Sequence, residues 1–80
     1  MKLPRDLSGD KLIKGLCRDW NYRTVHREGS HVILQTETPR HQRLAVPNHN
    51  PLRLGTLNAI LRAVAAHKGV DRQAVLESLH

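Results

Sequence analysis

The dipeptide Gly29-Ser30 separates two runs of alternating side chains, residues 22–27 and residues 32–36, and it constrains the fold more than any other stretch. Glycine at the first central position of a two-residue connection supplies the positive φ of a type II′ turn, so the pattern predicts a tight β-hairpin. Side chains alternate between the two faces of each strand. One face is therefore expected to carry Val25, Arg27, Val32 and Leu34, with Val25 opposite Leu34, and the other face to carry His26, Glu28 and His31.

The second of these faces presents a histidine beside a carboxylate, in or near water. An ordinary imidazole changes its charge near pH ~6.5, and a neighbouring carboxylate favours the protonated form, so the pair suits acid/base chemistry. The spacing alone is more typical of a solvated polar residue at a turn. The hairpin pattern by itself therefore leaves the role of His31 open.

The chain has 80 residues and one cysteine, Cys17, so we expect a single domain over residues 1–80 without an intrachain disulfide. A lone thiol, together with the lack of a leader pattern in residues 1–8, is typical of a reducing cytoplasm. No apolar run approaches the roughly 20 residues that a membrane-spanning helix needs. We expect a soluble, cytoplasmic protein without a membrane partner.

Thirteen Lys and Arg residues stand against seven Asp and Glu residues, which gives a formal net charge of +6. These cations are dispersed along the sequence, which favours a folded basic surface and a polyanionic partner: nucleic acid, an anionic membrane or an acidic protein. Domains that bind single-stranded RNA on a sheet stack bases on several aromatic side chains. With one Trp, one Tyr and no Phe, we expect nucleic-acid contacts to phosphates, sugars and helix shape instead.

Helical periodicity flanks the strand region. Ser8 is a candidate N-cap for a first helix, and Asn21, which tolerates the left-handed conformation, follows its last apolar position. Gly69 and Asp71 are expected to end the second helix and to cap the third. The expected elements are a helix over residues 9–20, strands over residues 22–27, 32–36 and 42–46, a helix over residues 56–68, and a last helix after Asp71. This order predicts an α+β domain in which helices cover the apolar face of a three-stranded antiparallel sheet.

From about residue 7 to residue 79, the sequence resembles the HicA (YcfA-like) mRNA interferase toxins of type II bacterial toxin-antitoxin pairs. Four features carry the resemblance in order: the helix leading into Asn21-Tyr22, the turn Gly29-Ser30-His31, the strand end Ala45-Val46-Pro47-Asn48-His49, and the helix start at residues 54–61. Two positions depart from the family pattern. Asn21 stands where glycine is usual, and residues 63–68 lengthen the second helix by about a turn.

The resemblance implies a double-stranded-RNA-binding-domain-like α-β-β-β-α fold, here with a short additional C-terminal helix. It implies an endoribonuclease that cuts mRNA without a metal or other cofactor, and the single histidine that this cleavage requires matches His31. It also implies a HicB-like antitoxin that covers the active-site surface. Contact with DNA would then be indirect, through the antitoxin.

Combined with general acid/base chemistry, the resemblance predicts attack of a ribose 2′-OH on the adjacent phosphate. His31 would either remove the 2′ proton or protonate the departing 5′ oxygen. Arg27 and Arg43 are candidates for steadying phosphates, although Arg27 is equally suited to shielding the strand edge. The full set of expected RNA-binding residues is Lys11, Lys14, Arg27, Ser30 and Arg43.

Other polar residues near the hairpin have further possible roles. His26 is a second proton carrier or a solvated strand residue, Glu28 tunes His31 or pairs with an arginine, and His49 shapes the loop after the third strand. A zinc site is not expected, because Cys17 lies in a helix stripe and the six histidines lack metal-ligand spacing. Two other functions remain open: a non-catalytic RNA-binding module of the same fold, and a protein whose basic surface serves only an acidic antitoxin.

Overall fold

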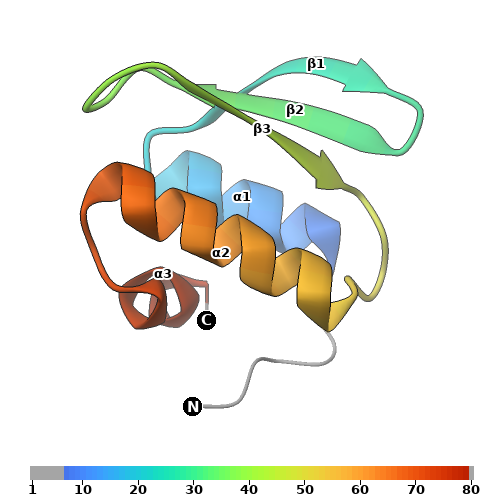
Figure 1. Ribbon diagram of the computed structural model, residues 1–80. Coiled ribbons are helices and arrows are strands. Elements are labelled where there is room, and N and C mark those ends of the chain that lie inside the picture. Colours follow the sequence, from blue (N-terminus) through green and yellow to red (C-terminus); the bar gives the residue numbers. More distant parts are fainter. Residues whose placement is uncertain (1–6, 80) are drawn as a thin grey trace.

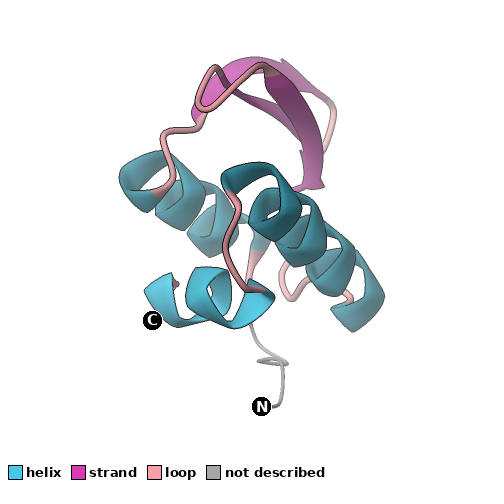
Figure 2. Ribbon diagram, turned by 60° about the vertical axis from the view of Figure 1, so that its left-hand side comes forward, coloured by secondary structure: helices cyan, strands magenta, loops and turns pink. Residues whose placement is uncertain are grey.

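Three helices and three strands follow one another in the order that the sequence predicts. The computed structural model describes residues 7–79, with α1 (Gly9–Asp19), β1 (Arg23–Glu28), β2 (His31–Thr36), β3 (Gln42–Pro47), α2 (Leu54–Lys68) and α3 (Arg72–Ser78). The strands form one antiparallel sheet in the order β1-β2-β3. The sheet lies on α1 and α2, and α3 packs below them as a third layer (Figures 1 and 2). The α+β class, α-β-β-β-α with a short additional helix, is confirmed.

The helix ends follow from local capping. The Ser8 hydroxyl accepts a hydrogen bond from the Lys11 amide at 3.2 Å, as an N-cap does. Asn21 and Gly69 have φ values of 61° and 70°, so the C-termini of α1 and α2 are each followed by a residue in the left-handed conformation, as expected. The second helix begins two residues before the predicted start, because the Arg53 carbonyl already accepts from the Leu57 amide at 2.9 Å.

The hairpin has the expected register next to its turn and a different one further away. Glu28 lies opposite His31, and His26 lies opposite Ile33, but the next pair along the ladder is Thr24 with Leu34. Val25 is therefore the extra residue of a β-bulge, and the predicted pairing of Val25 with Leu34 is wrong. Val25 is 38% exposed and does not join the core.

The buried face of the sheet is supplied mainly by the central strand. In β2 the buried residues Val32, Leu34 and Thr36 alternate with more exposed ones, and in β3 Val46 is fully buried. Apolar side chains from one face of each helix pack against these strand residues. Those with no more than 1% exposure are Leu12, Leu16, Leu57, Leu61, Val64, Val75 and Leu76.

The third helix fixes the C-terminal half of α1. The Trp20 indole donates to the Ser78 hydroxyl at 2.7 Å, and the Arg18 guanidinium donates to the Ser78 carbonyl at 3.2 Å. Leu79 packs over Gly15, where no side chain intervenes. This layer therefore closes the core on the side of the helices that faces away from the sheet.

Three distant segments meet beside the hairpin turn. The Asn48 amide donates to the Ser30 carbonyl at 2.6 Å, and the Gly9 amide donates to the His49 carbonyl at 2.8 Å. A Cβ on Gly9 would lie 2.5 Å from the Pro47 carbonyl oxygen and 2.8 Å from the Asn48 Cα. We call this region, made of Ser30, His31, residues 47–49 and the N-terminus of α1, the hairpin end.

The opposite end of the sheet is closed by Tyr22 and Lys68. The Tyr22 hydroxyl donates to the Gln42 side chain, and the Lys68 ammonium lies 4.8 Å from the centre of the Tyr22 ring. The same ammonium donates to the Thr36 hydroxyl at 2.9 Å. Burial raises the pKa of Tyr22 to about 12 and lowers the pKa of Lys68, because each charged form loses water.

The close approach at Gly9 predicts that Gly9→Ala destabilises the protein by about 1–3 kcal/mol, because the new methyl group meets backbone atoms that must shift. Gly55→Ala is the matched control, since a Cβ there meets nothing within 4 Å. That control should gain about 0.5–1 kcal/mol from its lower backbone entropy in the unfolded chain. Urea unfolding measures both values. A Gly9→Ala protein as stable as the wild type would contradict the packing described here.

The raised pKa of Tyr22 predicts a loss of stability at alkaline pH. An unfolded tyrosine ionises near pH ~10, whereas folded Tyr22 keeps its proton to about pH 12. Unfolding therefore releases a proton between these values, and the free energy of unfolding falls as the pH rises through this window. Tyr22→Phe should be less stable than the wild type at pH ~7, by about 1 kcal/mol for the lost hydrogen bond. The difference in unfolding free energy between the two proteins should narrow above pH ~10. Urea unfolding at several pH values measures this difference, and a constant difference would contradict the prediction.

Candidate functional site

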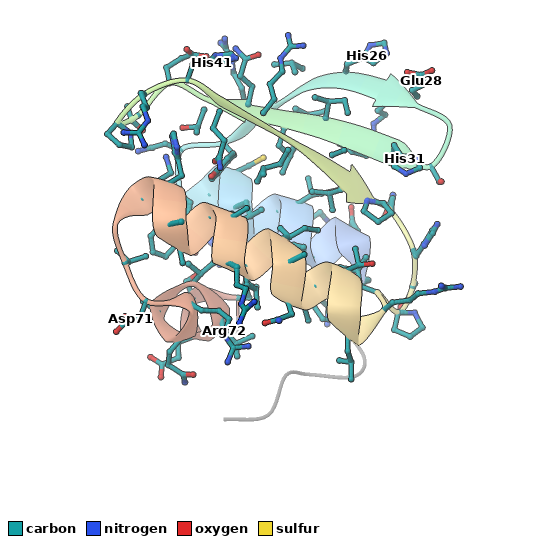
Figure 3. The ribbon with its side chains drawn as sticks, in the orientation of Figure 1. His26, Glu28, His31, His41, Asp71 and Arg72 are labelled. Carbon is teal, nitrogen blue, oxygen red and sulfur yellow. The ribbon has the colours of Figure 1, made fainter. Side chains whose placement is uncertain are left out.

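His31 is the first residue of β2, directly after the turn, and it is exposed. Gly29 has a φ of 61°, as the predicted turn requires. Because Val32 is buried against the helices, the alternation of β2 turns His31 toward the outer face of the sheet. Figure 3 shows it at the tip of the hairpin, next to the end of β3. The exposed position expected for this imidazole is confirmed, while its chemical role stays a prediction.

The surroundings of His31 are held rigidly by backbone contacts. Its register partners are Glu28 on β1 and Pro47 on β3. The hydrogen bond from Asn48 to Ser30 joins the turn to the end of β3, and the one from Gly9 to His49 joins that loop to α1. The His49 backbone thus helps to fix the loop, as expected. The hairpin and the strand-end motif that sequence analysis treated separately form one structural unit.

Glu28 pairs with neither of its expected partners. Its carboxylate lies 3.8 Å from Nε2 of His26, an ion pair that forms when His26 is protonated. Both side chains are solvent-exposed, at 63% for His26 and 85% for Glu28. By the register, both lie on the outer face of the sheet together with His31, and Figure 3 shows His26 and Glu28 on the side away from the helices.

The predicted RNA-binding residues divide into two groups around this point. Lys11 and Lys14 are exposed in the N-terminal half of α1, which begins at the hairpin end, and Lys14 forms an ion pair with Asp10 at 3.1 Å. Arg27 lies opposite Val32, so it leaves the β1 edge on the helix side of the sheet and remains exposed. Ser30 lies in the turn itself, beside His31.

Arg43 is not brought next to His31. It lies opposite Gln35 and donates to the Gln35 side chain at 2.9 Å. Gln35 is four residues along β2 from His31, a separation of about 13 Å at the usual rise of a strand. An RNA chain that contacts both groups would have to run along the outer face of the sheet.

A second surface feature lies at the opposite end of the sheet. A hollow of about 300 Å³ is lined by Asp19, Trp20, Asn21, Thr38, Pro39 and Lys68. Three of its polar side chains are already engaged: Lys68 with Thr36, Asp19 with Arg18 at 2.9 Å, and the Trp20 indole with Ser78. Sequence reasoning did not identify this hollow, and none of the predicted site residues lines it.

The described part of the chain, residues 7–79, holds no group of three or more His, Cys, Asp or Glu side chains placed to bind a metal ion. Cys17 is a free, half-buried thiol whose pKa is raised by burial, with a hydrogen bond to Thr24 acting in the opposite direction. In the same residues, no helix has the length and apolar character required to cross a membrane.

The fold and the exposed hairpin histidine define a small basic α+β protein of the kind that the sequence resemblance implied. The family model described as the HicA toxin of bacterial toxin-antitoxin systems matches residues 9–65, which run from the start of α1 into the C-terminal part of α2. The chain therefore belongs to the HicA toxin family, whose members act together with a cognate antitoxin. No curated protein and no solved structure gives a match.

Proposed function

We propose that this protein is the toxin of a type II toxin-antitoxin pair and an mRNA interferase, an endoribonuclease that cleaves RNA in the cytoplasm by metal-independent acid/base chemistry. The observation that carries the proposal is the exposed imidazole of His31, which follows the turn of a hydrogen-bonded hairpin on a protein of net charge +6. Membership of the HicA toxin family supports the same class of activity.

The reaction needs only groups that RNA and an imidazole supply. The ribose 2′-OH attacks the adjacent phosphorus, the bond from phosphorus to the 5′ oxygen breaks, and the products are a 2′,3′-cyclic phosphate and a free 5′-OH. His31 exchanges a proton with one of the two oxygens, and the other oxygen exchanges its proton with water or a second group of the protein. A positioned acid/base group contributes about 10² to 10⁴ in rate, which suits a toxin that cleaves slowly but persistently.

Binding of the RNA is assigned to the cations around the hairpin end. The candidates are Lys11 and Lys14 on α1, Arg27 on the helix side of the β1 edge, the turn residue Ser30 beside His31, and Arg43 further along the outer face. These groups bind phosphates without reading base sequence. The same exposed positive surface is open to an acidic protein, and we propose a HicB-like antitoxin that competes with RNA for it.

The role of His31 predicts that His31→Ala lowers RNA cleavage by at least about 10²-fold without loss of stability, because the side chain is exposed. The assay incubates wild-type and variant protein, made by cell-free synthesis, with a labelled mRNA in the presence of EDTA. Undiminished cleavage by the folded variant would refute the catalytic role. If wild-type protein binds the RNA without cutting it, the domain is a binding module and not a nuclease.

The proposed phosphate contacts predict a change in the salt dependence of RNA binding. The double variant Lys11→Gln/Lys14→Gln should reduce the magnitude of the slope of log K against log[salt] by about 1 to 2. Each phosphate contact releases counterions when RNA binds, so a protein with fewer contacts releases fewer of them. Arg40→Gln/Arg62→Gln is the matched control, since it removes the same charge from exposed positions outside the hairpin end. Binding is measured with an RNA whose 2′ positions are methylated, so that it cannot be cleaved. Equal slopes for both double variants would show that α1 does not contact the phosphates.

A further inference from the structure

A second histidine shares the outer face of the sheet with His31. His26 lies opposite Ile33, and Glu28 lies opposite His31, so the two histidines are diagonal neighbours on adjacent strands. Diagonal neighbours on one face have Cα atoms about 7–8 Å apart and side chains that reach a common point between them. Both side chains are exposed, so this point is open to a large substrate.

The bulge at Val25 changes the face of Thr24 without changing that of His26. In a regular strand the side chains of Thr24 and His26 would lie on the same face. Here the Thr24 side chain hydrogen-bonds the Cys17 thiol of α1, whereas His26 keeps the register that the turn imposes and faces outward. The extra residue therefore lets Thr24 contact α1 while His26 stays on the outer face, the kind of adjustment that bulges make near functional sites.

The carboxylate of Glu28 distinguishes the two histidines. It lies 3.8 Å from Nε2 of His26, and within residues 7–79 no carboxylate lies within ion-pair distance of His31. The Glu28 carboxylate can hold a protonated His26 ring by their ion pair, which suits His26 to donate a proton and leaves His31 to accept one. The two rings are thus suited to opposite roles in a reaction that moves one proton off an oxygen and another onto one.

We propose that His26 is a second catalytic residue, the general acid that protonates the departing 5′ oxygen, while His31 is the general base that removes the 2′ proton. This inference rests on the proposed RNA cleavage. As the bond from the 2′ oxygen to phosphorus forms, its proton passes to His31. As the bond from phosphorus to the 5′ oxygen breaks, a proton passes from His26 to that oxygen, and solvent restores both rings.

The geometry suits an in-line displacement. The attacking 2′ oxygen and the leaving 5′ oxygen lie on opposite sides of the phosphorus in the transition state, so the acid and the base must approach the phosphate from two sides. Two rings that extend from adjacent strands, at diagonal positions whose Cα atoms are about 7–8 Å apart, can flank one phosphate in this way. Glu28 acts as a positioning residue, because it holds the His26 ring by their ion pair.

The test compares two substrates that differ at the leaving atom. The cleavage site on an mRNA is first mapped with wild-type protein, and the same linkage is then made with sulfur in place of the 5′ oxygen. A thiolate leaves without being protonated, because thiols have a pKa near ~8.5, far below that of an alcohol. Loss of a general acid therefore harms cleavage of the oxygen substrate only.

We expect His26→Gln to lower cleavage of the oxygen substrate by at least about 10²-fold and cleavage of the sulfur substrate by less than about 10-fold. His31→Ala should lower cleavage of both. His41→Gln is the matched control, since His41 is also an exposed histidine paired with a carboxylate, Glu37 at 3.1 Å, but lies beyond the other end of β2. It should cleave both substrates like the wild type.

Each other result overturns the inference. No effect of His26→Gln, or equal loss on both substrates, would show that His26 does not donate the proton, while the effect of His31→Ala would still support the nuclease. Full activity of His31→Ala would instead refute the proposed function itself. Glu28→Gln provides a second variant if His26→Gln fails to fold, and its smaller loss should also be rescued by the sulfur substrate.

Discussion

The register of β2 decides what every other element presents to solvent. This strand is paired on both sides, and its side chains at Val32, Leu34 and Thr36 are buried while His31 and its outer-face neighbours are not. A shift by one residue would exchange the two faces and bury the imidazole. The core therefore fixes the orientation of His31, since two fully buried aliphatic side chains specify the register far more strongly than the exposed residues do.

Close backbone approach at Gly9 then fixes what stands next to that imidazole. The Pro47 carbonyl and the Asn48 Cα lie where any other residue would carry a side chain, so the loop after β3 rests on the first turn of α1. The same loop is bonded to the turn through Asn48 and Ser30. As a result, the hairpin end is held by contacts between segments that are nearly 40 residues apart in the sequence, and not by the hairpin alone.

Local chemistry explains why much of this could be predicted from the sequence. The positive φ of Gly29, the Ser8 cap and the left-handed Asn21 and Gly69 each depend on a residue and its near neighbours, and all four are confirmed. The face of His31 followed from the alternation of β2.

Non-local packing explains what could not be predicted. The bulge at Val25 places the Thr24 side chain where it hydrogen-bonds Cys17. This contact joins β1 to α1 and cannot be predicted from local sequence patterns. Because of the bulge, the expected pairing of Val25 with Leu34 is wrong. The partner of Glu28 was missed for a related reason. The register predicted His31 opposite Glu28, but the side-chain conformations bring the carboxylate to His26 on the same strand instead. The loop contact at Gly9 had one weak signal, a glycine directly after a helix cap.

The third helix stabilises the fold from a position away from the candidate site. It lies outside the part matched by the family model, and its contacts reach Gly15, Arg18 and Trp20 on α1, far from the hairpin end. A chain of 80 residues without a disulfide has a core of marginal stability, and each buried aliphatic side chain adds about 1.5–3 kcal/mol. By burying Val75 and Leu76, α3 holds α1 at one end while the loop after β3 holds it at the other. The sheet face that carries His26, Glu28 and His31 is then not needed for packing against another element, which is consistent with the proposed binding of a long polyanion there.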